Sequence, residues 1–505
     1  MDKVIESIIV VGGGTAGCIS ALMLKRRYPQ KNISIIESSK VGIVGVGESS
    51  TEHWTEFCKL IEIDPLIAIT KCNGTFKHGV HFENWAEKDF VHSIDDPHST
   101  RSLSYYAIYG HLISRNCDPF ELIDYPEYKF TGKYGYKKCL EGDPSYEKTP
   151  KCFKTSALVN QYHFDTFALN NFLHNLCKNR NIKIHIDDIN SIELNSENGE
   201  INSLSSEKSV YEADFFIDCS GFSKLLLHKK MNVPWVSYSK YLPVNSAIAF
   251  ATEEMEEYNS YTKSTARDYG WSWTIPTQTR TGNGYVYCDS FITKEQAHEE
   301  MEKCYGKELQ VSREFKFDPG RLEKSWNKNC FAVGLSQSFV EPLEATSIGS
   351  VIQQMFCFLH FLPSYGVDRC NDHINQIFDN IVDYIQAHYL VKKENTEFWK
   401  QIKYNFNLTD SLQNNLNKWR YKLPSLVDDV TCSWGMFGAI NYIQILYGLD
   451  WFDIDKIKKE YYDYFNSNLT QQIVLESVKK QCSCDHIYHK DLIKSILRYY
   501  NDTNS

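Results

Sequence analysis

The N-terminal segment places three glycines directly after a short apolar run. Residues 7–11, SIIVV, predict a buried strand, and the spacing G-x-G-x-x-G then leads into a helical pattern. The three glycines are Gly12, Gly14 and Gly17. A second apolar run, residues 32–38, ends near Glu37, twenty residues after the last of these glycines. Glycines here let the backbone approach a pyrophosphate at a helix N-terminus, and the carboxylate can accept a ribose hydroxyl. This order of strand, turn, helix, strand and acid predicts a dinucleotide-binding α/β fold.

Two distant segments suit the same fold. Residues 213–222, ADFFIDCSGF, predict a buried strand that runs into a glycine, and residues 326–355 predict another strand followed by a loop and a helix. We therefore expect an FAD- or nucleotide-binding domain over residues 1–355, with substrate-side insertions between its pieces. The pieces are residues 1–50, 150–225 and 326–355. From residue 356 to 505 apolar residues recur three and four apart, which predicts a mainly helical region.

Composition excludes several classes of function. The chain has 505 residues, 54 basic against 64 acidic, and a net charge of −10, so it lacks the cationic excess that sequence-independent nucleic-acid binding needs. No apolar run reaches the roughly 20 residues that span a bilayer, and the N-terminus is not a signal peptide. We expect a cytoplasmic protein with its 16 cysteines reduced. The cluster CSCDHIYH, with Cys482, Cys484, His486 and His489, is too crowded for the usual zinc spacing, so no metal is expected.

The stretch FKHGVHFENW, residues 76–85, alternates like a strand. In that alternation Lys77 shares a face with His81 and Glu83, which makes these two residues candidates for tuning it. The ten residues alone are equally typical of a strand whose lysine is solvated. Other parts of the chain have to decide whether this lysine does chemistry.

Four motifs together resemble the flavin-dependent tryptophan halogenase family, over most of residues 5–355. GGGTAG is similar to the family's glycine motif, and VGIVGVGESST, residues 41–51, to its second flavin-contacting loop. GWSWTIP, residues 270–276, carries the family's WxWxIP signature. FVEPLEATS, residues 339–347, is similar to the segment that holds the family's catalytic glutamate. The resemblance implies a Rossmann-like FAD-binding domain of the flavin monooxygenase type, with inserted strands and a mainly helical C-terminal region, residues 356–505, that binds the substrate.

The resemblance also implies the cofactor and its partners. FAD would arrive reduced, as FADH2, from a separate flavin reductase, because only one dinucleotide fingerprint is visible in the chain. With oxygen and a halide (chloride, bromide or iodide) it would give hypohalous acid, which passes through an internal tunnel to a separate pocket. The substrate there would be a small electron-rich aromatic of the indole or phenol type, tryptophan included. A homo-oligomer is left open. The implied FAD contacts are Gly12, Gly14, Thr15, Ala16, Gly17, Glu37, Val46, Gly47, Glu48 and Gly334.

By resemblance, Lys77 and Glu344 are the catalytic pair. A protonated lysine can donate a hydrogen bond to hypohalous acid, and a lysine of lowered pKa can instead form a haloamine; the sequence does not separate these routes. A carboxylate such as Glu344 can stabilise the ring cation and take its proton. From position alone, Glu344 also suits the first turn of a helix, where it would complement the dipole.

The remaining implied sites surround that pair. The backbone amides of Thr346 and Ser347 would hold the halide, since main-chain N–H groups are donors without a competing carboxylate. The residues of the signature would separate flavin from substrate, although two strand tryptophans are equally typical of a core. These residues are Trp271, Trp273, Ile275 and Pro276. The family commonly has PLEST followed by glycine, whereas this chain has Ala345 and Ser347, which leaves halide preference undetermined.

Two other functions fit parts of this pattern. A flavin monooxygenase that hydroxylates an aromatic would share the fold but would need its substrate at the flavin, which the WxWxIP segment argues against. A non-catalytic FAD-binding protein would share the glycine motif and leave the joint presence of four motifs without a reason.

Overall fold

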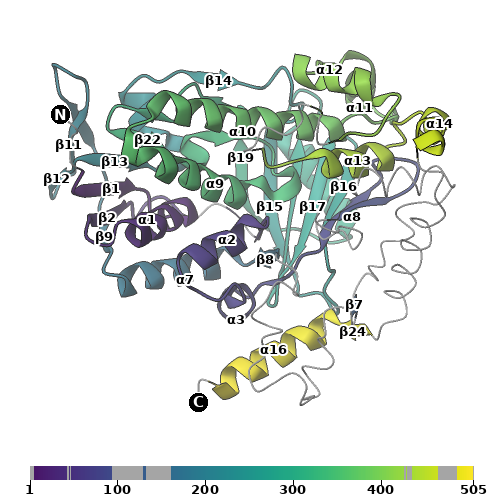
Figure 1. The fold of residues 1–505 in the computed structure, drawn as a ribbon. Helices are drawn as coiled ribbons and strands as arrows, with labels where there is room; N and C mark the ends of the chain where they lie inside the picture. Colours follow the sequence, from purple (N-terminus) through teal and green to yellow (C-terminus); the bar gives the residue numbers. More distant parts are fainter. Residues whose placement is uncertain are drawn as a thin grey trace.

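The computed structural model describes residues 5–42, 45, 47–93, 129–131, 161–425, 428, 435–464 and 486–503. Two large β-sheets, four smaller sheets of two or three strands and a layer of helices make up this part of the chain (Figure 1). The N-terminal strands lie at one side of the molecule, and the C-terminal helix lies below the second sheet (Figure 1).

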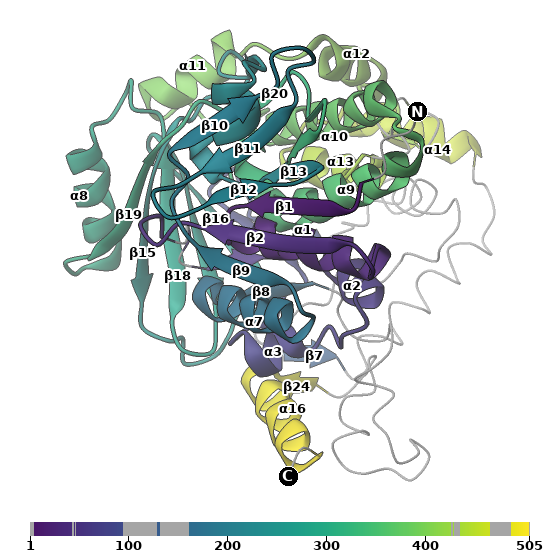
Figure 2. The ribbon, with the colours of Figure 1, turned by 90° about the vertical axis from the view of Figure 1, so that its left-hand side faces the viewer.

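The first sheet has six strands, and four of them are central to the nucleotide site. Its order is β21 (Trp326–Asn327), β22 (Cys330–Ala332), β13 (Phe215–Asp218), β1 (Ser7–Val11), β2 (Asn32–Glu37) and β9 (Lys183–Ile186). The pairs from β22 to β9 are parallel, with Val11 opposite both Ile36 and Asp218 (Figure 2). The strands expected at 7–11, 213–222 and 330–335 are therefore neighbours in one sheet, and the predicted Rossmann-like α/β class is confirmed.

Helices cover this sheet because its strands are apolar on both faces. The helices α7 (Thr166–Asn179) and α9 (Thr346–Phe361) both pack against α1 (Thr15–Arg27) beside it (Figure 1). Ile8, Val10 and Ile35 have no exposed surface or nearly none, as do Leu22 and Leu24 of α1. Continuous apolar strands of this kind are typical of parallel sheets buried on both faces.

The second sheet has seven strands and carries the WxWxIP signature in its interior. Its order is β19 (Val311–Lys316), β15 (Ser246–Thr252), β18 (Thr281–Tyr287), β17 (Gly270–Pro276), β16 (Thr262–Arg267), β5 (Gly79–Glu83) and β6 (Phe90–Ser93). The strand expected around Lys77 is not continuous. It is divided into β4 (Thr75–Phe76), which pairs with β8 (Tyr162–Phe164), and β5, which pairs with β16. Lys77 lies at the break between two sheets.

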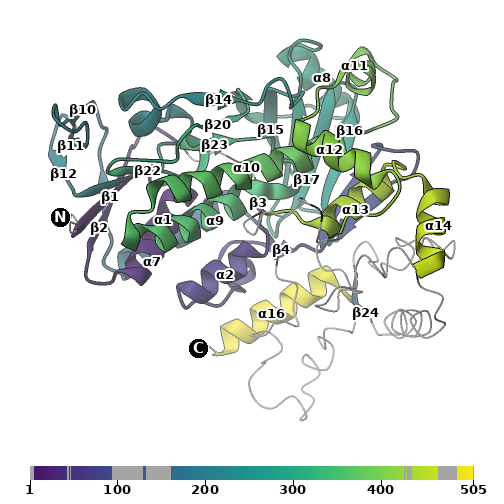
Figure 3. The ribbon, with the colours of Figure 1, turned by 45° about the horizontal axis from the view of Figure 1, so that its top comes forward.

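The helical part begins earlier than residue 356. After α9 follow α10 (Val367–His388), α11 (Glu397–Asn405), α12 (Asp410–Trp419), α13 (Ala439–Gly448), α14 (Ile454–Tyr464) and α16 (His489–Thr503). Figure 3 shows α9 and α10 side by side, with α13 beyond them and α16 apart. In the described chain, one helical segment, Leu343–Ser364, has the length and hydropathy to span a membrane. In its most apolar stretch of 18 residues, 78% of the residues are buried, as in the core helix of a globular protein.

Candidate functional site

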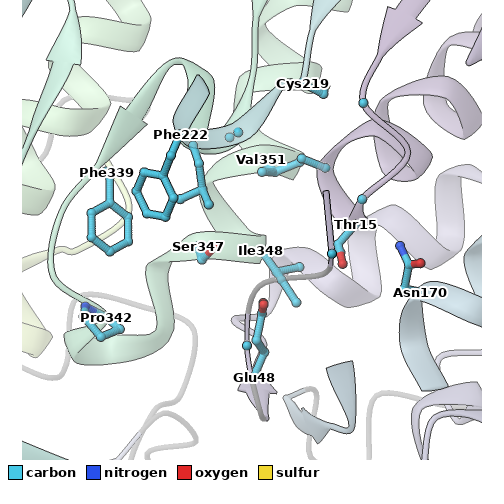
Figure 4. Close-up of a pocket in the computed structure, with 18 of the residues that line it drawn as sticks. Thr15, Glu48, Asn170, Cys219, Phe222, Phe339, Pro342, Ser347, Ile348 and Val351 are labelled. Carbon is cyan, nitrogen blue, oxygen red and sulfur yellow. The ribbon is translucent and has the colours of Figure 1, made fainter. Parts of the chain in front are cut away.

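One cavity of about 880 Å³ lies between the two sheets and reaches from the glycine turn to the break at Lys77. Figure 4 shows Thr15 and Asn170 at one end, Phe222, Phe339 and Pro342 at the other, and Ser347 with Ile348 between them. Most of the residues implied by the motifs line it: Gly12, Gly14, Thr15, Ala16, Glu37, Gly47, Glu48, Lys77, Trp271, Trp273, Ile275, Gly334, Glu344, Thr346 and Ser347. Gly17 and Pro276 lie outside its wall, and Val46 lies outside the described residues.

The glycine turn has the shape that a dinucleotide needs. Gly12 has φ +118°, and a Cβ there would lie 2.1 Å from the carbonyl oxygen of Cys219, so only glycine fits. A Cβ on Gly14 would meet nothing within 4 Å, so open cavity lies in front of it. Gly14 is also the N-cap of α1, and no side chain of the described chain caps this end. Its first-turn N–H groups are therefore available to a phosphate, and the residues fit a bound FAD.

Two acidic side chains, Glu37 and Glu48, line the cavity together with the glycine turn. Glu37 ends β2 and lies 3.0 Å from Nε2 of His174, with its carboxylate on the cavity wall. Glu48, in the short strand β3 (Glu48–Ser49), also faces the cavity (Figure 4). Burial raises the pKa of Glu48 to about 7. A carboxyl group in this state can donate or accept a hydrogen bond near neutral pH.

Lys77 is buried, with 1% of its surface exposed. Its backbone N–H donates to the carbonyl of Gln161 over 3.0 Å, and its side chain lines the cavity. Burial lowers the pKa of Lys77 to about 8, against the opposing attraction of Glu344 and Glu52. A solvated strand lysine would show none of these features.

Glu83 and His81, which we expected to tune Lys77, contact other residues instead. Glu83 is paired with Nζ of Lys263 at 2.8 Å and accepts a hydrogen bond from Thr265. His81 stacks on Tyr261 with ring centroids 4.9 Å apart. The expectation failed because the strand is interrupted after Phe76, so alternation does not carry across residues 77 and 78.

Glu344 lies in a strained turn before α9. Its φ is +65° and that of Ala345 is +56°, two consecutive left-handed conformations without glycine. The carboxylate is buried and accepts hydrogen bonds from His92 on β6 and from His388 at the end of α10. It therefore does not serve as the first-turn carboxylate of α9.

Burial raises the pKa of Glu344, but the nearby His92 and His388 more than offset this and hold it well below its ordinary value. Neither histidine was singled out from the sequence. A histidine in a short strand and another in an amphipathic helix give no pattern by themselves, and only the fold brings them to one carboxylate.

The turn that carries Glu344 also shapes the start of α9. The N-cap is Ala345, and no described side chain caps the helix or places a carboxylate in its first turn. The change from left-handed Ala345 to right-handed Thr346 directs successive N–H groups towards one side, the geometry of an anion-binding concavity. Thr346 and Ser347 both line the cavity here.

The WxWxIP strand, β17, lines the cavity with Trp271, Trp273 and Ile275. The indole N–H of Trp271 donates to Oε1 of Glu341 over 3.0 Å, and Tyr389 donates to the same oxygen over 2.7 Å. The ring of Trp273 lies flat on Gly284 of β18, where a Cβ would come within 2.0 Å of it. The carbonyl of Pro276 accepts a hydrogen bond from Thr75, which ties this strand to β4.

One residue of the CSCDHIYH cluster, His489, lies beside the site. Nε2 of His489 accepts a hydrogen bond from the backbone N–H of Phe76 over 3.1 Å, one residue before Lys77. His489 is fully buried. Cys482 and Cys484 lie outside the described residues, and in the described chain no group of His, Cys, Asp and Glu could hold a metal ion.

One cavity thus combines a dinucleotide-binding turn, the uncapped start of α9 and the buried side chains of Lys77 and Glu344. This combination is typical of a flavin enzyme. Residues 7–455 match the Tryptophan halogenase family, and the chain belongs to this family. It is a flavin-dependent halogenase, an oxidoreductase that uses reduced FAD and a halide.

Relatives and solved structures agree with this assignment. The chain is 30% identical over 459 residues to Tryptophan 6-halogenase ThaL of Streptomyces albogriseolus, covering 84% of this chain and 83% of the relative. It is 29% identical to Tryptophan 7-halogenase RebH of Lentzea aerocolonigenes, covering 89% and 90%. A crystal structure of a tryptophan halogenase from Shewanella frigidimarina matches with TM-score 0.81 and 25% identity over 99% of both chains.

Proposed function

We propose that this halogenase acts on a small electron-rich aromatic, of the indole or phenol type and with tryptophan among the candidates. Lys77 and Glu344 are its catalytic residues, and Thr346 and Ser347 hold the halide. The observation that carries the proposal is the single cavity that joins the glycine turn to both catalytic side chains.

Bound reduced FAD, with oxygen and halide, supplies hypohalous acid. The wall made by Trp271 and Trp273 keeps an aromatic substrate from the nucleotide end while leaving a route for a small molecule along the cavity. This favours halogenation over hydroxylation, because direct oxygen transfer would need the ring beside the cofactor.

Lys77 receives the hypohalous acid at the far end of the cavity. Its ammonium can donate a hydrogen bond to the acid's oxygen and so make the halogen more electrophilic. A pKa near 8 leaves an appreciable fraction of neutral amine in mildly alkaline solution, so a haloamine route is also open.

Glu344 acts on the ring. Electrophilic attack makes the ring cationic, and a buried carboxylate stabilises that charge far more than water would. Its depressed pKa keeps it ionised throughout the working pH range.

The substrate proposal rests on the relatives named above, which are tryptophan 6- and 7-halogenases. In the described chain, Tyr384 of α10, Tyr442 of α13 and Phe437, just before α13, lie next to one another behind His92, with ring centroids of Tyr384 and Phe437 3.9 Å apart. These rings are buried and do not line the cavity, so they pack behind its wall.

A reconstituted reaction tests the proposal. The protein is mixed with FAD, a flavin reductase, NADH, oxygen, chloride, bromide or iodide in turn, and a set of indoles and phenols. We expect products whose mass and isotope pattern show one added halogen. Products that carry oxygen instead would establish the monooxygenase reading, and flavin binding without any product would establish a non-catalytic role.

A further inference from the structure

Glu344 is enclosed by histidines from two elements that are far apart in the sequence. Nδ1 of His92 lies 2.8 Å from both carboxylate oxygens, and Nε2 of His388 lies 3.1 Å from Oε1. The side chains of all three residues are at most 3% exposed. Because these side chains are shielded from water, their hydrogen-bond partners determine their protonation states.

The tautomer of His92 follows from Asn441. The side-chain oxygen of Asn441 accepts from the backbone N–H of Gly438 over 2.7 Å, so its NH2 group faces Nε2 of His92 at 2.9 Å. That amide nitrogen can only donate, so Nε2 accepts and the ring proton is on Nδ1. His92 is therefore a neutral ring that donates to both oxygens of Glu344.

The charge of His388 follows from the groups on either side of it. Nδ1 lies 2.8 Å from the backbone carbonyl of Tyr384, which can only accept, so Nδ1 carries a proton. Glu344 already accepts from His92 at both oxygens, as an ionised carboxylate does. Nε2 of His388 must then donate to Oε1, and a histidine that donates from both nitrogens is an imidazolium cation.

The other titratable groups around the carboxylate agree with this arrangement. The hydroxyl of Tyr384 lies 3.3 Å from the ring nitrogens of His92, and burial together with Glu344 raises the pKa of Tyr384, so it stays neutral. Among the residues that the structure describes, Lys77 is a further cation whose field reaches Glu344. The Glu344 carboxylate thus has the imidazolium of His388 on the side of α10 and the side chain of Lys77 on the side of the cavity.

We propose that His388 is a cationic positioning residue which, with neutral His92, keeps Glu344 ionised and oriented towards the aromatic ring. Neither histidine lines the cavity, and both contact Glu344, so both act through the carboxylate. The ion pair follows from the geometry, and its role in halogenation rests on the function proposed above. Replacing His388 by glutamine keeps an N–H donor but removes the charge, so it separates the cation from the hydrogen bond.

The protonation state is tested on the flavin-free protein. Nitrogen NMR of ring-labelled histidine, with His388→Gln used for assignment, should show His388 protonated on both nitrogens at neutral pH. In Glu344→Gln the same ring should be neutral, because its counter-ion is gone. A singly protonated His388 in the wild-type protein would overturn the proposal.

The role in catalysis is tested with tryptophan and indole as probes. His388→Gln should lower halogenated product per NADH consumed by about 10-fold or more, in the range of a misplaced charge at a reaction centre. The matched control is His298→Gln, a partly exposed histidine 3.6 Å from Glu302, which should behave as wild type. Undiminished product per NADH in His388→Gln would overturn the role. A wild-type protein that shows the doubly protonated ring but halogenates nothing would refute the proposed function and leave the ion pair standing.

Discussion

The carboxyl group of Glu341 accepts a 3.0 Å hydrogen bond from the indole N–H of Trp271, which lies in β17. Glu341 is fully buried, and burial raises its pKa to about 8, so it is a neutral acid at neutral pH. Trp271 is thus oriented by a group that never enters the cavity.

Glu341→Gln should therefore preserve the fold and the position of Trp271. The wild-type acid has a folded pKa of about 8 against 4.5 unfolded, so its contribution to stability is lost as pH rises between these values. Glutamine cannot ionise, so the variant should gain on the wild type by a few kcal/mol at mildly alkaline pH and by little near pH 4.5. Urea unfolding at several pH values measures this difference; a constant difference across pH would contradict it.

Lys77→Met should stabilise the protein while abolishing halogenation. Holding the pKa of a lysine near 8 instead of 10.5 corresponds to about 3 kcal/mol of unfavourable burial at neutral pH. Because the folded pKa is the lower one, this cost falls away as pH rises from about 8 towards 10.5. Thermal unfolding should show a higher midpoint for the variant at neutral pH and a smaller gap in alkaline solution.

The control for that comparison is Lys59→Met, an exposed lysine paired with Glu56 on α2 (His53–Leu60). It should change stability by less than about 1 kcal/mol at any pH, as surface ion pairs do. A Lys77→Met protein no more stable than this control would show that the lysine is better solvated than its burial indicates.

Gly284→Ala should displace Trp273. The added methyl group would lie 2.0 Å from the indole, so the ring must move and the wall between the cavity ends must open or shift. We expect normal FAD binding but a fall of about 10-fold in halogenated product per NADH, with the remainder lost as peroxide. Ser312→Ala, on the edge strand of the same sheet, is the control. Unchanged product per NADH in Gly284→Ala would remove the proposed role of the Trp273 position.

His489→Ala should leave the amide of Phe76 without its acceptor. A buried N–H without a partner costs about 1–3 kcal/mol, and the strand next to Lys77 loses its support. Halogenation should fall more than flavin binding, while Ser495→Ala on the exposed side of α16 should alter neither. His489→Gln, which offers an amide oxygen, should recover part of the loss; equal loss in both variants would mean that the ring's packing matters instead.

The sequence was informative wherever a local pattern has one structural meaning. The glycine turn, the strands on either side of it and Glu37 follow from spacing, because few other arrangements use three glycines after an apolar strand. The interrupted strand at Lys77 could not be foreseen, since alternation over ten residues looks the same whether or not the backbone changes partners. The residues around Glu344 were also out of reach, because His92 lies about 300 positions before His388 and further still before Asn441, and the three meet only in the fold.

The hydrogen bond between His489 and Phe76 has a consequence for how the chain matures. Residues that form the glycine turn and its sheet have all left the ribosome by the end of β22, so the flavin half can acquire its fold early. The amide beside Lys77 gains its acceptor only when residue 489 has been made, more than 400 positions later. The support beside Lys77 is thus synthesised much later than the glycine turn, although both belong to the wall of one cavity.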